Sequence, residues 1–94
     1  MRRAARVDAN HAAIVAALRQ VGATVQDLAK VGQGCPDILV GFRGRNYLME
    51  IKVNKGKPTP AQDAWHLTWQ GQVVIVRDVD EALHVIGAIR YDTH

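Results

Sequence analysis

The stretch Pro36–Lys52, which reads PDILVGFRGRNYLMEIK, decides the fold of this chain. Two apolar runs, Ile38–Phe42 and Tyr47–Val53, are joined by Arg43-Gly44-Arg45-Asn46. Glycine and asparagine between two runs rich in β-forming residues indicate a hairpin. Because apolar residues fall on both faces of the two predicted strands, we expect a sheet that is covered on both sides.

One end of the predicted hairpin gathers three charged side chains. We expect a four-residue loop that pairs Phe42 with Tyr47. In that register Asp37 lies opposite Lys52, diagonal to Glu50 and on the same face as both. Two carboxylates this close repel each other, so the pKa of one rises unless a cation lies between them. The alternative is an ordinary surface ion pair between the lysine and one carboxylate.

A hard divalent ion such as Mg²⁺ fits this arrangement of oxygen ligands. A lysine beside such an ion can orient an attacking water and offset the charge that develops on a phosphoryl group. The hairpin therefore predicts a metal site, with the surface ion pair as the competing interpretation.

The same residues resemble the signature of the PD-(D/E)XK nucleases. Pro36-Asp37 is followed, after twelve residues, by Glu50-Ile51-Lys52. The surrounding sequence resembles the small VRR-NUC branch of these nucleases, in Gly34–Gly41, in Tyr47–Lys52 and in the helix start Thr59-Pro60-Ala61-Gln62. The likeness runs from about Val7 to Ala88, which is nearly the whole chain.

The resemblance implies a metal-dependent endonuclease that hydrolyses DNA phosphodiester bonds. Asp37, Glu50 and the carbonyl of Ile51 would hold Mg²⁺ or Mn²⁺. Lys52 would position the attacking water or stabilise the charged transition state, and Gln62 would orient a phosphate or that water. Because stand-alone VRR-NUC proteins are often phage-encoded, the resemblance also suggests such an origin. It implies a homodimer that cuts branched DNA, such as four-way (Holliday) junctions. No small-molecule cofactor is implied.

One position departs from the VRR-NUC pattern. The pattern places a glutamate that helps to hold the metal in the first predicted helix, Asp8–Val21, and the matching position here is Ala13. His11 lies about half a turn away and so projects in a different direction. Two other functions therefore stay open: a DNA-junction-binding module that has lost its chemistry, or a nuclease subunit that needs a partner chain. The first predicts binding without cleavage, and the second predicts cleavage only with the partner.

Two loops that flank the signature supply the predicted DNA contacts. Lys30–Cys35 bears two glycines, which let backbone approach a phosphate, and Asn54–Pro58 is short and basic. For both loops, the alternative is an ordinary connection between elements. The candidate contacts are Lys30, Gln33, Lys55 and Lys57.

Composition indicates a single domain over residues 1–94, with tails at 1–6 and 91–94. At 48% hydrophobic and 22% charged residues, the chain reads as globular rather than disordered. A net charge of +3 and a pI near 9.4 suit a polyanionic partner. The arginines of Met1–Arg6 are interpreted as part of a solvated tail rather than as DNA contacts.

The cysteine content and the hydropathy of the chain indicate its cellular compartment. The single cysteine, Cys35, excludes an internal disulfide and a zinc cluster of cysteines, and it fits a reducing cytoplasm. We interpret Cys35 as a small buried hydrophobe rather than a nucleophile. No run approaches the ~18–20 apolar residues of a membrane span, and no signal-peptide core is present at the N-terminus. We therefore expect a cytoplasmic protein without a membrane partner.

The remaining pattern completes an α/β fold of order α-β-β-β-α-β-α. A strand, a helix and a strand between Tyr47 and Val76 imply a parallel pair. We expect a mixed four-stranded sheet with helices on both faces, which matches the restriction-endonuclease-like core that the resemblance implies. Trp65 and Trp69 are predicted to make a core or subunit contact rather than to stack on bases. The other predicted elements are strand Ala23–Ala29, a helix from Thr59 to about Gln70, strand Val73–Val76 and helix Asp80–Ile89, with caps at Asp8 or Asn10, at Thr59, and at Asp78 or Asp80.

Overall fold

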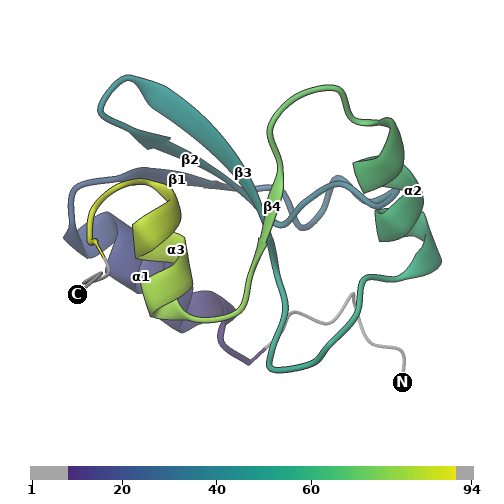
Figure 1. The fold of residues 1–94 in the computed structure, drawn as a ribbon, viewed down its shortest axis with the longest axis horizontal. Helices are drawn as coiled ribbons and strands as arrows, with labels where there is room; N and C mark the ends of the chain where they lie inside the picture. The colour runs from purple at the N-terminus through teal and green to yellow at the C-terminus, as the bar shows by residue number, and fades with distance from the viewer. Residues whose placement is uncertain (1–8, 91–94) are drawn as a thin grey trace.

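A computed structural model describes residues 9–90 of the chain, as a four-stranded sheet with three helices (Figure 1). The strands lie in the order β1-β2-β3-β4; the first three are antiparallel, and β3 pairs with β4 in parallel. The elements in chain order are α1 (His11–Gln20), β1 (Thr24–Asp27), β2 (Ile38–Phe42), β3 (Arg45–Ile51), α2 (Pro60–Thr68), β4 (Val74–Val76) and α3 (Val79–Val85). The predicted α/β order and mixed sheet are confirmed. The expected cap at Asp8 and the expected tails at 1–6 and 91–94 lie outside the described residues.

The register of the hairpin differs from the prediction. Phe42 pairs with Arg45 rather than with Tyr47, so the loop is the two-residue turn Arg43-Gly44. Both turn residues have positive φ, 51° and 80°, as in the turns that suit the twist of a hairpin. The predicted four-residue loop was wrong because an arginine seldom adopts this conformation. The shift is two positions along the strand, so each side chain keeps its predicted face.

The hydrophobic core lies between one face of the sheet and the pair α1 and α3. Figure 1 shows these two helices side by side, with α2 apart from them. Ile14 and Leu18 of α1 are fully buried because they lie one turn apart on the same side of the helix. The opposite face of the sheet is less well covered, since Leu39 and Leu48 are only half-buried. The core residues from the strands and α3 are Ile38, Val40, Met49, Ile51, Val76 and Ala82.

The helix starts follow local capping chemistry. Thr59 is the N-cap of α2, with Pro60 in the first turn, as predicted. Asp78 caps α3 by accepting a hydrogen bond from the backbone of Glu81 at 2.8 Å. Asn10 is the N-cap residue of α1 but makes no side-chain cap bond. Its Nδ2 group donates to two distant carbonyls, and its Oδ1, the atom that would accept a cap bond, has no hydrogen-bond partner among the described residues. Across residues 9–90, the helices are too short and too polar to traverse a lipid bilayer.

Candidate active site

Asp37 lies directly before β2 and is held against the end of β3. Its backbone N–H donates to the carbonyl of Met49 at 3.0 Å, and its Oδ2 accepts from the N–H of Ile51 at 2.7 Å. The carbonyl of Asp37 also accepts from Leu28, after β1. These three bonds fix the carboxylate beside Glu50 rather than opposite Lys52, because the hairpin register is shifted by two residues.

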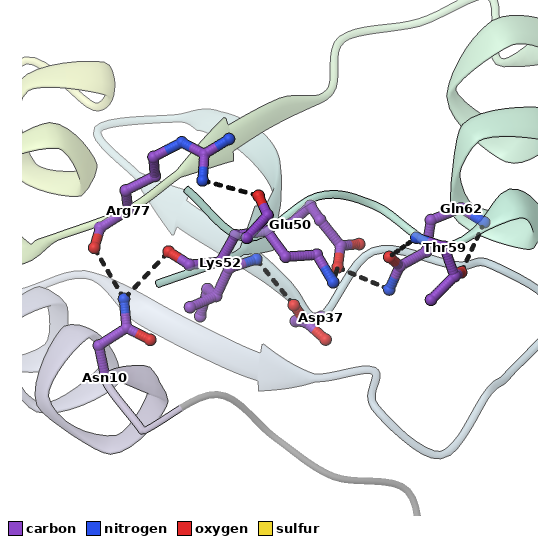
Figure 2. A network of polar contacts seen from close by, with 9 residues as sticks. Asn10, Asp37, Glu50, Lys52, Thr59, Gln62 and Arg77 are labelled. Carbon is purple, nitrogen blue, oxygen red and sulfur yellow. Dashed lines mark hydrogen bonds and ion pairs between the residues drawn. The ribbon is translucent and has the colours of Figure 1, made fainter. Parts of the chain in front are cut away.

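Glu50 is the one buried charged residue among those the structure describes, and its exposed fraction is 0%. Its Oε2 accepts from Nε2 of Gln62 at 2.8 Å and lies 3.5 Å from Nζ of Lys52 (Figure 2). Its Oε1 is buried without a hydrogen-bond partner among the described residues. The structure therefore brings four predicted residues, Asp37, Glu50, Lys52 and Gln62, to one point, and it places Ile51 beside them through its N–H.

Burial and the neighbouring carboxylate control the ionisation of this site. They raise the pKa of Glu50 from its ordinary value of 4.5 to about 8, burial acting most strongly and Asp37 next, while Lys52 lowers it. Burial also raises the pKa of the Cys35 thiol, and the charges of Glu50 and Asp37 add to that effect. A thiol with a raised pKa is a poor nucleophile, which agrees with its predicted role as a small hydrophobe. Its side chain is half-buried rather than fully buried.

The residues present fit a hard divalent cation. A buried carboxylate oxygen without a partner, next to a second carboxylate, supplies the type of ligand that Mg²⁺ and Mn²⁺ prefer. A cation would also favour the ionised form of Glu50, which burial disfavours. In residues 9–90 no group of three or more His, Cys, Asp or Glu side chains is placed to hold a metal, so the acidic set is Asp37 and Glu50. Ligation by these two, and by the Ile51 carbonyl, stays a prediction.

The first turn of α1 approaches this site without contributing an acid. Ala13 is exposed, and the turn contains no acidic residue. Asn10, three residues earlier, donates to the carbonyl of Lys52, so this turn lies near the end of β3. The side chain of His11 instead pairs with Asp27, with Nε2 lying 3.9 Å from Oδ2, rather than with Asp37 or Glu50. At Ala13, where the VRR-NUC resemblance predicts a glutamate, the structure therefore supplies no acid.

Asn10 and Arg77 are site neighbours that sequence patterns did not indicate. The amide of Asn10 bridges the carbonyls of Lys52, at 3.3 Å, and of Arg77, at 2.8 Å. The Arg77 guanidinium donates to the carbonyls of Asn54 and Gly56, the latter at 2.9 Å. Together they hold the carbonyl of Lys52 and the loop that follows it (Figure 2). No motif spacing could have revealed this, because the contacts join residues 42 and 67 positions apart.

The predicted DNA contacts lie on two loops. The side chains of Lys30 and Gln33 are exposed between β1 and β2, and those of Lys55 and Lys57 are exposed between β3 and α2. The second loop leaves Lys52 directly and is held by Arg77. Their contact with DNA stays a prediction.

The fold and the site define an α/β domain of the restriction-endonuclease-like class. No protein-family model matches the chain, and no curated protein matches it either. A solved structure described as "VRR_NUC domain" is similar to it, with a TM-score of 0.66 and 26% sequence identity. The similarity covers 81% of this chain and 88% of that one. It confirms the predicted relationship to the VRR-NUC family of nucleases, for which the strand-end carboxylates were the first indication.

Proposed function

We propose that this chain is a metal-dependent endonuclease that hydrolyses DNA phosphodiester bonds. The observation that carries the proposal is the environment of Glu50: a fully buried carboxylate with one oxygen bound by Gln62 and Lys52 and the other without a partner, beside Asp37. A purely structural ion pair would satisfy both oxygens, because an unpaired buried acceptor is unfavourable.

Each side chain has a separate part in this proposal. Asp37 and Glu50 would hold Mg²⁺ or Mn²⁺, with the Ile51 carbonyl as a further ligand. When bound, the cation would supply Lewis-acid activation of the scissile phosphate and of water. Lys52, whose side chain is 13% exposed, can donate to the attacking water or to a phosphate oxygen and offset the charge of the transition state. Exposed Lys30, Gln33, Lys55 and Lys57 would position the DNA backbone.

Branched DNA is the proposed substrate, and a homodimer is the proposed form. Among the described residues α2 buries no side chain; Leu67 is 86% exposed, and Trp69 stacks on Trp65 at 4.4 Å. The uncovered apolar side chains are Leu67 on α2 and those of an uncharged hollow that is lined by Leu39, Asn46, Leu48, Trp69 and Gln72. We propose that a second copy covers them, which would present two sites to the paired strands of a four-way junction.

A second candidate function rests on Ala13. Because α1 supplies no acid to the site, the chain could bind junctions without cutting them, or need a partner chain that completes the metal site. Restored cleavage upon addition of a partner would identify the latter case.

Cleavage of duplex, flap and four-way DNA in Mg²⁺ or Mn²⁺ tests the main proposal. The wild-type chain is compared with Lys52→Ala and with Ala13→Glu, which restores the family's acid. We expect Lys52→Ala to abolish cleavage and Ala13→Glu to increase it, because a third carboxylate strengthens the metal site. Equal activity of all three chains would contradict the site assignment. Junction binding by a wild-type chain that never cuts would establish the binding-module alternative.

A further inference from the structure

The first turn of α2 contains a set of reciprocal hydrogen bonds that ends on Glu50. The hydroxyl of Thr59 accepts from the backbone N–H of Gln62 at 3.2 Å, while Oε1 of Gln62 accepts from the N–H of Thr59 at 2.8 Å. This pair is a capping box, the arrangement that satisfies free N–H groups at the start of a helix. The Nε2 group of the same amide donates to Glu50, as Figure 2 shows. One side chain therefore closes the helix cap and contacts the buried carboxylate.

The chemistry of the two neighbours determines which way the Gln62 amide lies. The N–H of Thr59 can only donate, so it must meet the amide oxygen. A Glu50 that holds a cation is ionised and can only accept, so it then meets the amide NH₂ group. A flipped amide would place donor against donor at one end and acceptor against acceptor at the other. The capping box therefore sets the polarity of the group that faces Glu50.

This polarity makes the two oxygens of Glu50 unequal. Oε2 has both Gln62 and Lys52 as neighbours, at 2.8 Å and 3.5 Å, whereas Oε1 has no partner. We propose that Thr59 is a positioning residue of the metal site, an inference that rests on the proposed nuclease function. Through the capping box it directs the Gln62 NH₂ group onto Oε2 of Glu50 and so leaves Oε1 to the divalent cation. Groups that orient a metal ligand in this way control metal affinity without touching the ion.

Packing of the preceding loop holds the same turn in place. Gly34 has φ +83°, and a Cβ atom at this position would overlap the carbonyl of Ala61. The loop before Asp37 is therefore pressed against the turn that carries Gln62. The turn therefore has two independent restraints, one from its cap and one from this loop. Both limit the movement of the turn that carries the Gln62 side-chain amide.

The test measures metal binding rather than cleavage. Affinity for Mn²⁺ is measured from the electron paramagnetic resonance signal of free Mn²⁺, for the wild-type chain, Thr59→Ala, Thr59→Ser, Gln62→Ala and the double variant. We expect Thr59→Ala to weaken binding roughly tenfold, and Thr59→Ser to retain wild-type affinity because it keeps the hydroxyl. In the Gln62→Ala background, Thr59→Ala should have no further effect on affinity, since the residue it acts through is gone.

A matched control separates positioning from helix capping. Asp78→Ala removes the N-cap hydrogen bond of α3 and should lower stability as Thr59→Ala does, yet leave Mn²⁺ affinity unchanged. Without metal, hydrogen exchange of the Gln62 side-chain amide, followed by ¹⁵N NMR, should be slow in the wild-type chain and fast in Thr59→Ala.

Three results would overturn this role. Equal loss of affinity from Thr59→Ala with and without Gln62 would mean that Thr59 acts independently of the amide. Unchanged amide exchange in Thr59→Ala would mean that the cap does not fix it. In both cases the nuclease proposal survives, because cleavage and its dependence on Lys52 are measured separately. A wild-type chain that binds no Mn²⁺ would instead overturn the metal-dependent function itself, and this role with it.

Discussion

Replacing Glu50 with glutamine should change how the stability of the metal-free protein depends on pH. The pKa of this buried carboxyl is about 8 in the folded chain, against an ordinary value of 4.5. Between these two pH values the folded state keeps a proton that the unfolded state has released. Unfolding therefore becomes easier as pH rises through this window, and the stability contributed by the protonated group is lost by the time pH passes 8.

The size of the effect follows from the same two pKa values. Their difference, about 8 minus 4.5, multiplied by ~1.4 kcal/mol per pKa unit, sets a ceiling of about 5 kcal/mol. Glutamine resembles the protonated acid, so the Glu50→Gln variant should match the wild-type chain near pH 4. Near pH 9, without divalent cations, the variant should be more stable by a few kcal/mol.

Urea unfolding, followed by the fluorescence of Trp65 and Trp69, measures this difference from pH 4 to 9 in a chelator. Asp63→Asn is the matched control, because it removes an exposed carboxylate from α2 and should follow the wild-type profile. Added Mg²⁺ should stabilise the wild-type chain at high pH, since a ligand that binds only the folded state raises its stability. It should leave the Glu50→Gln variant unchanged. Parallel profiles of the wild-type and Glu50→Gln chains over the whole range would refute the reasoning.

Three other substitutions test the surroundings of the site. Gly34→Ala should lower the melting temperature more than Gly32→Ala, because both glycines have positive φ but only a Cβ at position 34 overlaps Ala61; equal shifts in calorimetry would contradict the close packing. Asn10→Ala should lower the free energy of unfolding in urea by about 1–3 kcal/mol, since two carbonyls at the strand ends lose their shared donor. Leu67→Lys should convert a dimer into a monomer, as measured by light scattering, because it places a charge on the exposed apolar surface of α2; a wild-type chain that is already monomeric would end the dimer proposal.

The local sequence pattern was enough to predict the helices and strands and which side chains lie on the same face of a strand. The alternation of side chains along a strand has a period of two, so Glu50 and Lys52 share a face whatever the rest of the chain does. The cap at Thr59 was also predicted, and Asp78 was one of two candidates for the cap of α3, because a cap depends on residues within one helical turn. The mixed sheet followed from the order of the elements, since a helix between two strands favours parallel pairing.

The register of the hairpin was beyond sequence reasoning. The two-residue turn requires Arg43 at φ 51°, a conformation that arginine seldom adopts, so composition indicated a longer loop. The pairing of β2 with β3 along its whole length, including Ile38 with Met49, outweighs the local preference of one residue. As a result Asp37 lies beside Glu50 and bonds the N–H of Ile51.

What the sequence alone determined is the identity of the acidic and basic groups and the strand end on which they lie. Tertiary structure decided their environment: the complete burial of Glu50, the amide of Gln62 on one of its oxygens, and the tether from Asn10 to the carbonyls of Lys52 and Arg77. The physical reason is the distance along the chain over which each effect acts. Capping and alternation act over a few residues, whereas burial and the pKa shifts it causes depend on segments that are distant in sequence and meet only when the sheet and helices pack.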